Sequence, residues 1–388
     1  MSFLASSKNI YLQISLLANL QIFKSSNHQI LGSSLSLRSF FIMADKRDIR
    51  GLSQHELEEF VVASGEKKFR ASQIYEWIWK KGASSFDDMK NISKPMREML
   101  SENFRFDNVE CIYTVSSSDR THKFLFQTND GHRFEGVLIP SADRVTACIS
   151  TQIGCQMGCA FCATGKLGFK RNLTSGEIFH QIFSLNKLAT EIFGIPLSNI
   201  VVMGMGEPLM NYENTLSAID MICSEKSLGM SPQRITLSTC GIAPQVKRLA
   251  DDGIRFNLSI SLHSAINSKR NEIMPINRKY NLDELSEAIS YFCKKTGKRI
   301  TYEYLMLGGV NDSMDDAHAL TEFTRISPCK INIIEYNPHE GDNFKKTNNE
   351  TLVNFINHIE SRNIVVTIRK SKGCDIAAAC GQLANMKK

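Results

Sequence analysis

The sequence has no apolar run of the roughly 20 residues that a membrane-spanning helix needs, so it predicts no membrane partner. It also has no signature of disorder or of a fibre, because 42% of its residues are apolar and 22% are charged, as in ordinary globular proteins. Its 388 residues fit one large domain or two to three smaller ones. The net charge of +6 is modest and only mildly favours a polyanionic partner.

The chain also lacks the even set of cysteines that marks a secreted disulfide framework. Its eleven cysteines are an odd number and are scattered from Cys111 to Cys380. This distribution favours a reducing compartment, since disulfide frameworks belong to oxidising ones. We therefore expect the protein to lie in the cytoplasm.

Aspartate and glutamate are missing altogether from residues 1–43, which are rich in serine and carry three Lys and Arg residues. This composition is typical of an organellar transit peptide. The apolar stretch 10–23 is short and interrupted by polar residues, so it does not predict a membrane anchor. A second interpretation stays open, in which Met43 is the true start and the upstream residues are a poorly ordered or mis-assigned extension. An organellar location is the alternative that the first interpretation implies.

Residues 44–108 are predicted to form a small helical domain. Ser53 and Glu56 have the spacing of a capping box that begins a helix. Apolar residues then recur at helical spacing from Phe69 to Lys81, where a Lys-Lys-Gly sequence is a stop signal. The basic residues of this segment would either contact phosphates or form a solvated helix face, and both alternatives stay open.

Between residues 109 and 144 the apolar pattern changes to a period of two. Two of its β-rich runs flank Asn129-Asp-Gly131, which is a hairpin turn signal. These residues predict a small antiparallel sheet that leads into the core. Residues 346–388 are predicted to form a C-terminal segment with one more strand, Asn363–Ser371.

From residue 145 to residue 345, strand-like and helix-like runs alternate. The helical patterns include Ser175–Phe193 and Leu282–Lys295. Six such βα units predict an α/β fold with a parallel sheet, open or curled into a partial barrel. The strand-like runs are Val145–Thr151, Asn199–Met205, Arg234–Cys240, Arg255–Ser261, Arg299–Met306 and Cys329–Asn337.

Most of these strand-like runs end in polar or glycine-rich residues. In parallel α/β folds the carboxyl ends of the strands form the ligand-binding edge, so these endings predict one shared site. The sequences at the ends are CQMGC, GMGEP, STCG, SLH and YNP.

Cys155, Cys159 and Cys162 have CxxxCxxC spacing, and no fourth cysteine or histidine is close enough in sequence to complete the set. A structural zinc site needs four protein ligands. Thiolates are the usual ligands of iron–sulfur clusters, and a cubane held by three of them keeps one iron open. The alternative is three reduced cysteines packed as small apolar residues, which the dense spacing argues against. The spacing predicts a cluster with an open iron.

The cysteine loop together with Gly204-Met-Gly-Glu-Pro208 resembles the radical S-adenosylmethionine (SAM) superfamily. A narrower resemblance, over about residues 46–385, is to the RlmN/Cfr family of radical SAM methyltransferases that modify adenine carbons in RNA, and most of all to its RlmN branch. It implies a partial (βα)6 TIM-like barrel. The segments that carry it are Glu135–Pro140, Cys148–Cys155, Gly168–Leu173, Met203–Leu209, Ser261–His263 and Ala378–Leu383.

This resemblance implies a mechanism with two SAM molecules and a methyl-cysteine intermediate. Cys380 takes a methyl group from the first SAM, and a radical from a second SAM, bound at a 4Fe–4S cluster, removes a hydrogen from that methyl. The carbon radical adds to C2 of adenine, Glu135 acts as the base, and Cys148 releases the product by forming a disulfide. Thiolates are suitable nucleophiles and carboxylates suitable bases. Without the resemblance, Cys148 and Cys380 are ordinary buried thiols.

The resemblance also implies the ligands of both cofactors. Cys155, Cys159 and Cys162 would bind the 4Fe–4S cluster, whose open iron would bind SAM. The further SAM contacts carried over are Gly206, Glu207, Ser238, Ser261, Leu262, His263 and Asn337.

The implied partners are 23S ribosomal RNA, at an adenosine in the peptidyl-transferase loop, and some tRNAs, at the adenosine beside the anticodon. A low-potential electron donor such as flavodoxin or ferredoxin is implied as well, and residues 44–108 would be an accessory RNA-binding domain. Basic groups at residues 67–70, 166–171 and 369–372 would bind phosphates. The target adenine has to leave its stack to reach a site at the strand ends.

Two positions depart from the family pattern. Cys240 stands where serine is more familiar, and Cys374 lies six residues before Cys380, where we expect an acidic residue. The second departure puts a spare thiol near the carrier. Two other functions stay open, which are C8 methylation as in the Cfr branch and a non-enzymatic RNA-binding protein with a structural metal.

Overall fold

The computed structural model describes residues 46–338 and 343–384, so both interpretations of residues 1–43 lie outside the described residues. Within these ranges the largest sheet has ten strands. In chain order they are β3 (Val109–Ser116), β4 (His122–Thr128), β5 (Arg133–Ser141), β6 (Arg144–Cys148), β9 (Asn199–Val202), β10 (Ile235–Thr239), β11 (Asn257–Ser261), β12 (Ile300–Met306), β13 (Cys329–Glu335) and β14 (Val366–Arg369). Their order in the sheet is β14-β13-β12-β11-β10-β9-β6-β5-β4-β3.

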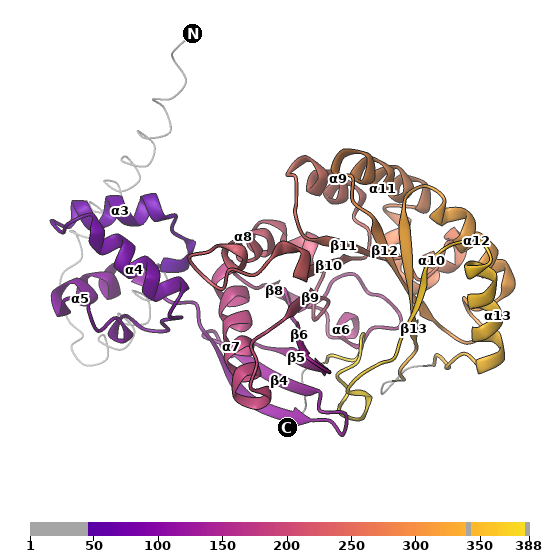
Figure 1. Ribbon diagram of the computed structural model, residues 1–388, viewed down its shortest axis with the longest axis horizontal. Helices are drawn as coiled ribbons and strands as arrows, with labels where there is room; N and C mark the ends of the chain where they lie inside the picture. Colours follow the sequence, from indigo (N-terminus) through magenta and orange to yellow (C-terminus); the bar gives the residue numbers. More distant parts are fainter. Residues whose placement is uncertain (1–45, 339–342, 385–388) are drawn as a thin grey trace, which may run out of the picture. The chain divides into compact units, whose positions relative to one another are not determined.

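The parallel half of this sheet, from β6 to β14, forms the core. All seven residues of β12 are buried, as expected for a strand covered on both faces. Helices lie along the outside of the curved sheet (Figure 1). They are α7 (Ser175–Phe193), α8 (Tyr212–Cys223), α9 (Ala243–Asp251), α11 (Leu282–Thr296), α12 (Met314–Thr324) and α13 (Asn349–Glu360). The predicted α/β fold with a curved parallel core is confirmed.

Helix α7 shows how local sequence sets the bounds of an element. Thr174 accepts a hydrogen bond from the backbone of Glu177, whose side chain bonds back, and this capping box begins the helix. Gly194 ends it with a left-handed φ of 75°. The predicted bounds of this helix are therefore the observed ones. The core strands end up to three residues before their predicted ends.

The antiparallel half, β3 to β6, continues directly into the parallel core. Strand β6 pairs antiparallel with β5 on one side and parallel with β9 on the other, so both halves belong to one sheet. The predicted hairpin turn at residues 129–131 does join β4 and β5. Alternating apolar residues predict that a run forms a strand. They do not show which strand pairs with it on its other side.

The predicted helical segment contains α3 (Gln54–Ala63), α4 (Phe69–Trp79) and α5 (Lys94–Asn103). The capping box is present, with Ser53 Oγ accepting from the Glu56 N–H at 3.1 Å and Glu56 Oε2 accepting from the Ser53 N–H at 2.7 Å. Trp79 packs edge-on against Phe179 of α7, with ring centroids 4.7 Å apart. No helix within the described ranges is long and apolar enough to cross a bilayer.

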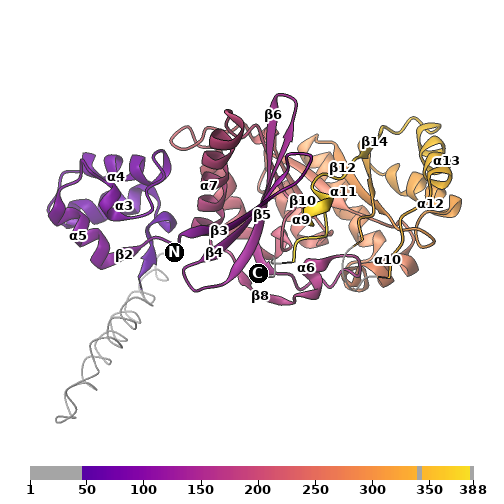
Figure 2. The ribbon, with the colours of Figure 1, turned by 90° about the horizontal axis from the view of Figure 1, so that it is seen from below.

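After β14 the chain crosses back over the carboxyl ends of the strands (Figure 2). We call residues 373–384 the carrier segment. On one side, Thr164 of α6 (Ala163–Lys166) donates from Oγ1 to the Leu383 carbonyl at 2.6 Å. On the other side, Ser117 in the β3–β4 turn donates from Oγ to Asp375 Oδ1 at 2.5 Å. The segment therefore connects α6 with the antiparallel half of the sheet.

Candidate active site

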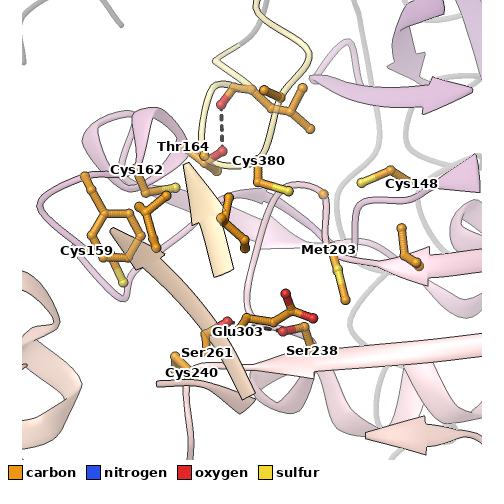
Figure 3. A pocket seen from close by; sticks show the side chains of 18 of the residues that line it. Cys148, Cys159, Cys162, Thr164, Met203, Ser238, Cys240, Ser261, Glu303 and Cys380 are labelled. Atoms are coloured by element: carbon orange, nitrogen blue, oxygen red, sulfur yellow. Dashed lines mark hydrogen bonds between the residues drawn. The ribbon is translucent and has the colours of Figure 1, made fainter. Parts of the chain in front are cut away.

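A cavity opens at the carboxyl ends of the parallel strands (Figure 3). Its volume of about 240 Å³ is several times the ~30 Å³ share of a water molecule, so it admits a small molecule. Strand ends, the cysteine loop and the carrier segment all contribute to its wall. Ten predicted site residues line it, namely Cys148, Cys155, Cys159, Cys162, Gly206, Glu207, Ser238, Ser261, His263 and Cys380.

The loop with Cys155, Cys159 and Cys162 follows β7 (Gln152–Gly154), which pairs with β8 (Phe169–Asn172). Gly154 has a φ of 76°, and a Cβ there would lie 1.7 Å from the Gly168 carbonyl oxygen, so this position needs glycine. Burial raises the pKa of Cys155 to about 12 and that of Cys159 well above its ordinary value. A positive metal centre would favour the thiolates. No group of three or more Cys, His, Asp or Glu in the described ranges is arranged around a single metal ion.

Gly204 and Gly206 lie in the turn after β9 and let it pack against the chain before the cysteine loop. A Cβ at Gly204 would lie 2.6 Å from the Ile149 carbonyl oxygen, and one at Gly206 would lie 2.5 Å from Gln152 Cβ. Gly206 also has a φ of 100°. Packing within the protein therefore requires glycine at both positions, and both line the cavity.

The carboxylate of Glu207 joins the ends of β9 and β10. It accepts hydrogen bonds from Thr239 Oγ1 at 2.7 Å, from the Leu209 N–H at 3.0 Å and from the Cys240 N–H at 2.8 Å. Burial raises the pKa of Glu207, while these donors favour its ionised form. A ligand at this wall would meet a carboxylate that the protein already holds in place.

Ser238 lies near the end of β10, and Ser261 and His263 lie at and just after the end of β11. The two serine hydroxyls lie 3.1 Å apart. His263 Nδ1 accepts a hydrogen bond from the Leu305 N–H at 3.0 Å. Burial, with the charge of Arg270 adding to it, lowers the pKa of His263 to about 3. The ring is therefore neutral near pH 7 and carries its hydrogen on Nε2.

Leu262 and Asn337 do not line the cavity. The Leu262 side chain is fully buried in the core. Asn337 donates from Nδ2 to Ser371 Oγ at 2.6 Å and accepts on Oδ1 from Cys374 Sγ at 3.3 Å. The cofactor contacts expected at these two positions stay predictions.

The thiols of Cys148 and Cys380 point into the same space from opposite walls of the cavity (Figure 3). Burial raises the pKa of Cys148 to about 12, and Cys380 adds to the rise. The Cys380 side chain is exposed to the cavity, but the surrounding walls still raise its pKa by burial. The positive charge of Arg369 opposes both shifts, so Arg369 favours both thiolates.

Glu135 does not reach this cavity. It lies on β5 and is fully buried. Its Oε2 accepts from the Ala384 N–H at 3.0 Å, and its Oε1 lies 3.4 Å from Lys123 Nζ. The structure therefore places the expected base beneath the carrier segment, next to a buried lysine.

Two charged residues of the cavity wall, Glu303 and Arg369, were not among the predicted catalytic or cofactor-binding residues. Glu303 accepts on Oε1 from Asn332 Nδ2 at 2.9 Å, and its Oε2 lies 3.5 Å from Arg369 Nη1. A glutamate inside an otherwise uncharged, buried strand is a usable signal, because burying an unpaired carboxylate is costly. Arg369 was predicted only as part of a basic group for phosphates.

Comparison with known proteins shows the class to which this fold belongs. Residues 149–320 match the radical SAM superfamily, and residues 47–105 match the ribosomal RNA large subunit methyltransferase N-terminal domain. The crystal structure of a radical SAM methyltransferase from Sphaerobacter thermophilus is similar, with a TM-score of 0.83 and 38% identity over 88% of this chain and 100% of that one. The chain has the radical SAM fold, whose superfamily implies a 4Fe–4S cluster and SAM.

Individual relatives narrow this class to a family. The probable dual-specificity RNA methyltransferase RlmN of Flavobacterium johnsoniae is 48% identical over 341 residues, which are 88% of this chain and 98% of that protein. The probable RlmN of Cytophaga hutchinsonii is 50% identical over 339 residues, 87% of this chain and 93% of that protein. The chain belongs to the RlmN family of radical SAM RNA methyltransferases, and the predicted resemblance is confirmed.

Proposed function

We propose that this chain places a methyl group on C2 of an adenosine in the peptidyl-transferase loop of 23S ribosomal RNA, and on the adenosine beside the anticodon in some tRNAs. The observation that carries the proposal is the convergence of Cys148 and Cys380 on the cavity that the three-cysteine loop also lines. The names of the relatives, which are dual-specificity RNA methyltransferases, support an RNA substrate of more than one kind.

Cys155, Cys159 and Cys162 would hold the 4Fe–4S cluster and leave one iron open for SAM. Three thiols on one loop suit a cubane, since iron–sulfur clusters take cysteine ligands. When bound, the cluster and SAM supply the methyl group and the radical that removes a hydrogen from carbon. The proposed further SAM contacts are Gly206, Glu207, Ser238, Ser261, Leu262, His263 and Asn337.

Cys380 is the proposed nucleophile and methyl carrier, and Arg369 favours its thiolate. Glu135 is the proposed base that takes the proton from the substituted ring carbon. Cys148 then attacks the sulfur of Cys380. The disulfide forms as the bond from that sulfur to the methylene carbon on the adenine breaks, and this carbon takes up a proton to become the methyl group of the released base. The facing positions of the two thiols support this last role.

Residues 44–108 are proposed as an accessory RNA-binding domain, 109–144 as the β segment, 145–345 as the radical SAM core and 346–388 as the C-terminal segment with the carrier. In the basic group at residues 166–171, Arg171 forms ion pairs with Asp130 and Glu177, so Arg171 is the weaker candidate for a phosphate contact. Flavodoxin or ferredoxin is the proposed reductant. These partners suit the cytoplasm, or an organelle if residues 1–43 are a transit peptide.

The test is an anaerobic assay of the reconstituted full chain with SAM, a reductant and RNA fragments, followed by nucleoside mass spectrometry. We expect 2-methyladenosine. A product with the methyl on C8 would replace the C2 assignment. Failure to cleave SAM, together with zinc alone at the three cysteines, would support the non-enzymatic RNA-binding function.

The carrier can be identified by mass spectrometry of the tryptic peptide after Lys372. We expect a methyl group on Cys380, and we expect Cys380→Ala to abolish RNA methylation. Cys374→Ala is the matched control, because Cys374 does not line the cavity and bonds to Asn337 instead. A methyl group found only on Cys374 would overturn the assignment of the carrier.

A further inference from the structure

Glu135 is shielded from any molecule in the cavity. Its side chain has no exposed surface, and Ala384 at the end of the carrier segment donates its N–H to Oε2. A general base has to come within hydrogen-bond reach of the proton that it takes, either directly or through one water. A base in the proposed role therefore needs the end of the carrier segment to lift away from β5.

Lys123 connects this shielded carboxylate to the carrier segment. Its side chain is only 4% exposed, and Nζ lies 3.4 Å from Glu135 Oε1 and donates to the Ala377 carbonyl at 3.1 Å. Lys123 on β4 is opposite Val137 of β5, and Leu125 is opposite Glu135. Lys123 and Glu135 are thus diagonal neighbours on one face of an antiparallel pair, where long side chains can meet. One ammonium group holds both the expected base and the segment of the expected carrier.

Further contacts hold the carrier segment at the β3–β4 turn. Asp375 accepts from the hydroxyl and the N–H of Ser118, at 3.2 Å and 3.1 Å, and Asp119 Oδ2 accepts from the Gly373 N–H at 3.0 Å. Between these contacts and Ala384, Ala377 has a φ of 51°. A non-glycine residue keeps this left-handed conformation only where its surroundings hold it. The contacts of the carrier segment therefore hold Ala377 in a strained conformation, and the strain is released when the segment moves away from β5.

We propose that Lys123 is a positioning residue for the transfer step. It keeps Glu135 in place beneath the carrier segment and holds that segment through Ala377, while the contact at Ala384 opens to admit the adenine. This inference rests on the proposed function, because it takes Glu135 as the base and Cys380 as the carrier. It adds no covalent step to the reaction.

The first test measures only how firmly the carrier segment is held against the rest of the protein, and it needs neither cofactor nor RNA. Hydrogen exchange is followed in the cluster-free full chain for peptides that cover the carrier segment. We expect Lys123→Met to make their exchange about tenfold faster, since the ion pair and the bond to Ala377 are lost together. Lys187→Met is the matched control, because Lys187 lies on α7, is 74% exposed and pairs with Glu191 in the next helical turn, away from the carrier segment.

Lys123→Arg should restore most of the protection, because it keeps a positive charge and N–H donors at this position. Unchanged exchange in the β12 and β13 peptides would show that each variant is folded. Equal exchange of the carrier segment in Lys123→Met and the wild type would overturn the proposal.

The second test separates methyl loading from methyl transfer in the reconstituted enzyme. We expect Lys123→Met to carry the methyl group on Cys380 but to transfer it to RNA at least about tenfold more slowly, because Glu135 and the carrier segment then lose the ammonium group that holds both of them in place. Lys123→Arg should recover transfer. Transfer at the wild-type rate in Lys123→Met would contradict the positioning role. No RNA methylation by the wild type would instead refute the proposed function, and the exchange result would still stand.

Discussion

Glu303 and Arg369 place opposite charges on the wall beside Cys380. Burial raises the pKa of Cys380, Glu303 adds to the rise and Arg369 opposes it. Glu303→Gln should therefore lower the pKa of this thiol, and Arg369→Gln should raise it. Below its pKa the fraction of thiolate, and with it the alkylation rate, changes by a factor of ten for each unit of pKa shift.

The measurement is the rate of iodoacetamide labelling of Cys380 at pH 8 in cluster-free protein, read by peptide mass spectrometry. We expect Glu303→Gln to label about threefold faster than the wild type and Arg369→Gln about threefold slower, the effect of roughly half a pKa unit. Labelling of the distant Cys293 on α11 is the internal control. A change of the same sign in both variants would contradict electrostatic control of the thiol.

At the scale of single residues, sequence motifs single out the two thiols, whereas no motif shows the surroundings of Glu135. Cys148 and Cys380 stand in recognisable motifs, and both line the cavity. Among the partners of Glu135 are Lys123 on another strand and Ala384 near residue 388. No local pattern connects these three positions, because only the assembled sheet brings them together.

At the scale of elements, the turn after β9 requires glycine at position 206, because neighbouring residues leave no room there for a Cβ. Gly206→Ala would put a Cβ 2.5 Å from Gln152 Cβ at a φ of 100°. Gly253→Ala, at a φ of 63° with nothing within 4 Å, carries only the conformational cost, which is about 1–2 kcal/mol. We expect Gly206→Ala to lower the free energy of unfolding by at least about 1 kcal/mol more, as overpacking in a close-packed interior does.

Urea unfolding of the two cluster-free variants measures this difference. SAM binding to the reconstituted proteins should weaken in Gly206→Ala and stay unchanged in Gly253→Ala, because only Gly206 lines the cavity. Equal losses of stability in both variants would mean that the turn can shift to make room for a methyl group.

Elements with strong local signals were predicted closely. The capping box and the terminal Gly194 define α7 at both ends, whereas several core strands, such as β6 and β9, stop earlier than their β-rich runs. The run at Asn199–Met205, for example, leaves the sheet after Val202, and the following glycine-rich turn packs against residues 149–152. A β-rich composition does not show where a strand loses its neighbour, since this depends on the strands beside it.

At the scale of the whole molecule, the helical segment, the sheet and α7 meet at Arg50, Val109 and His180. Arg50 is buried and donates to the Asp107 carbonyl at 3.1 Å. His180 Nδ1 accepts from the Val109 N–H at 3.0 Å. Burial, with the charge of Arg50 adding to it, lowers the pKa of His180 to about 3. The junction therefore requires a neutral imidazole.

This requirement predicts a loss of stability in mild acid. The pKa of histidine in the unfolded chain is about 6.5, and that of His180 in the folded protein is about 3. Between these values the unfolded chain binds a proton that the folded protein does not, so the free energy of unfolding falls as the pH falls from about 6.5 toward 3. For one such histidine the loss between pH 7.5 and pH 5.5 is about 1.4 kcal/mol.

His180→Gln keeps an acceptor for the Val109 N–H and removes the titration. Urea unfolding of cluster-free protein at both pH values should show that the variant loses about 1.4 kcal/mol less than the wild type. His263, whose pKa is also lowered to about 3 by burial, stays in both proteins and contributes equally to both losses. Equal losses in the variant and the wild type would mean that acid acts elsewhere and that His180 accepts a proton without opening the junction.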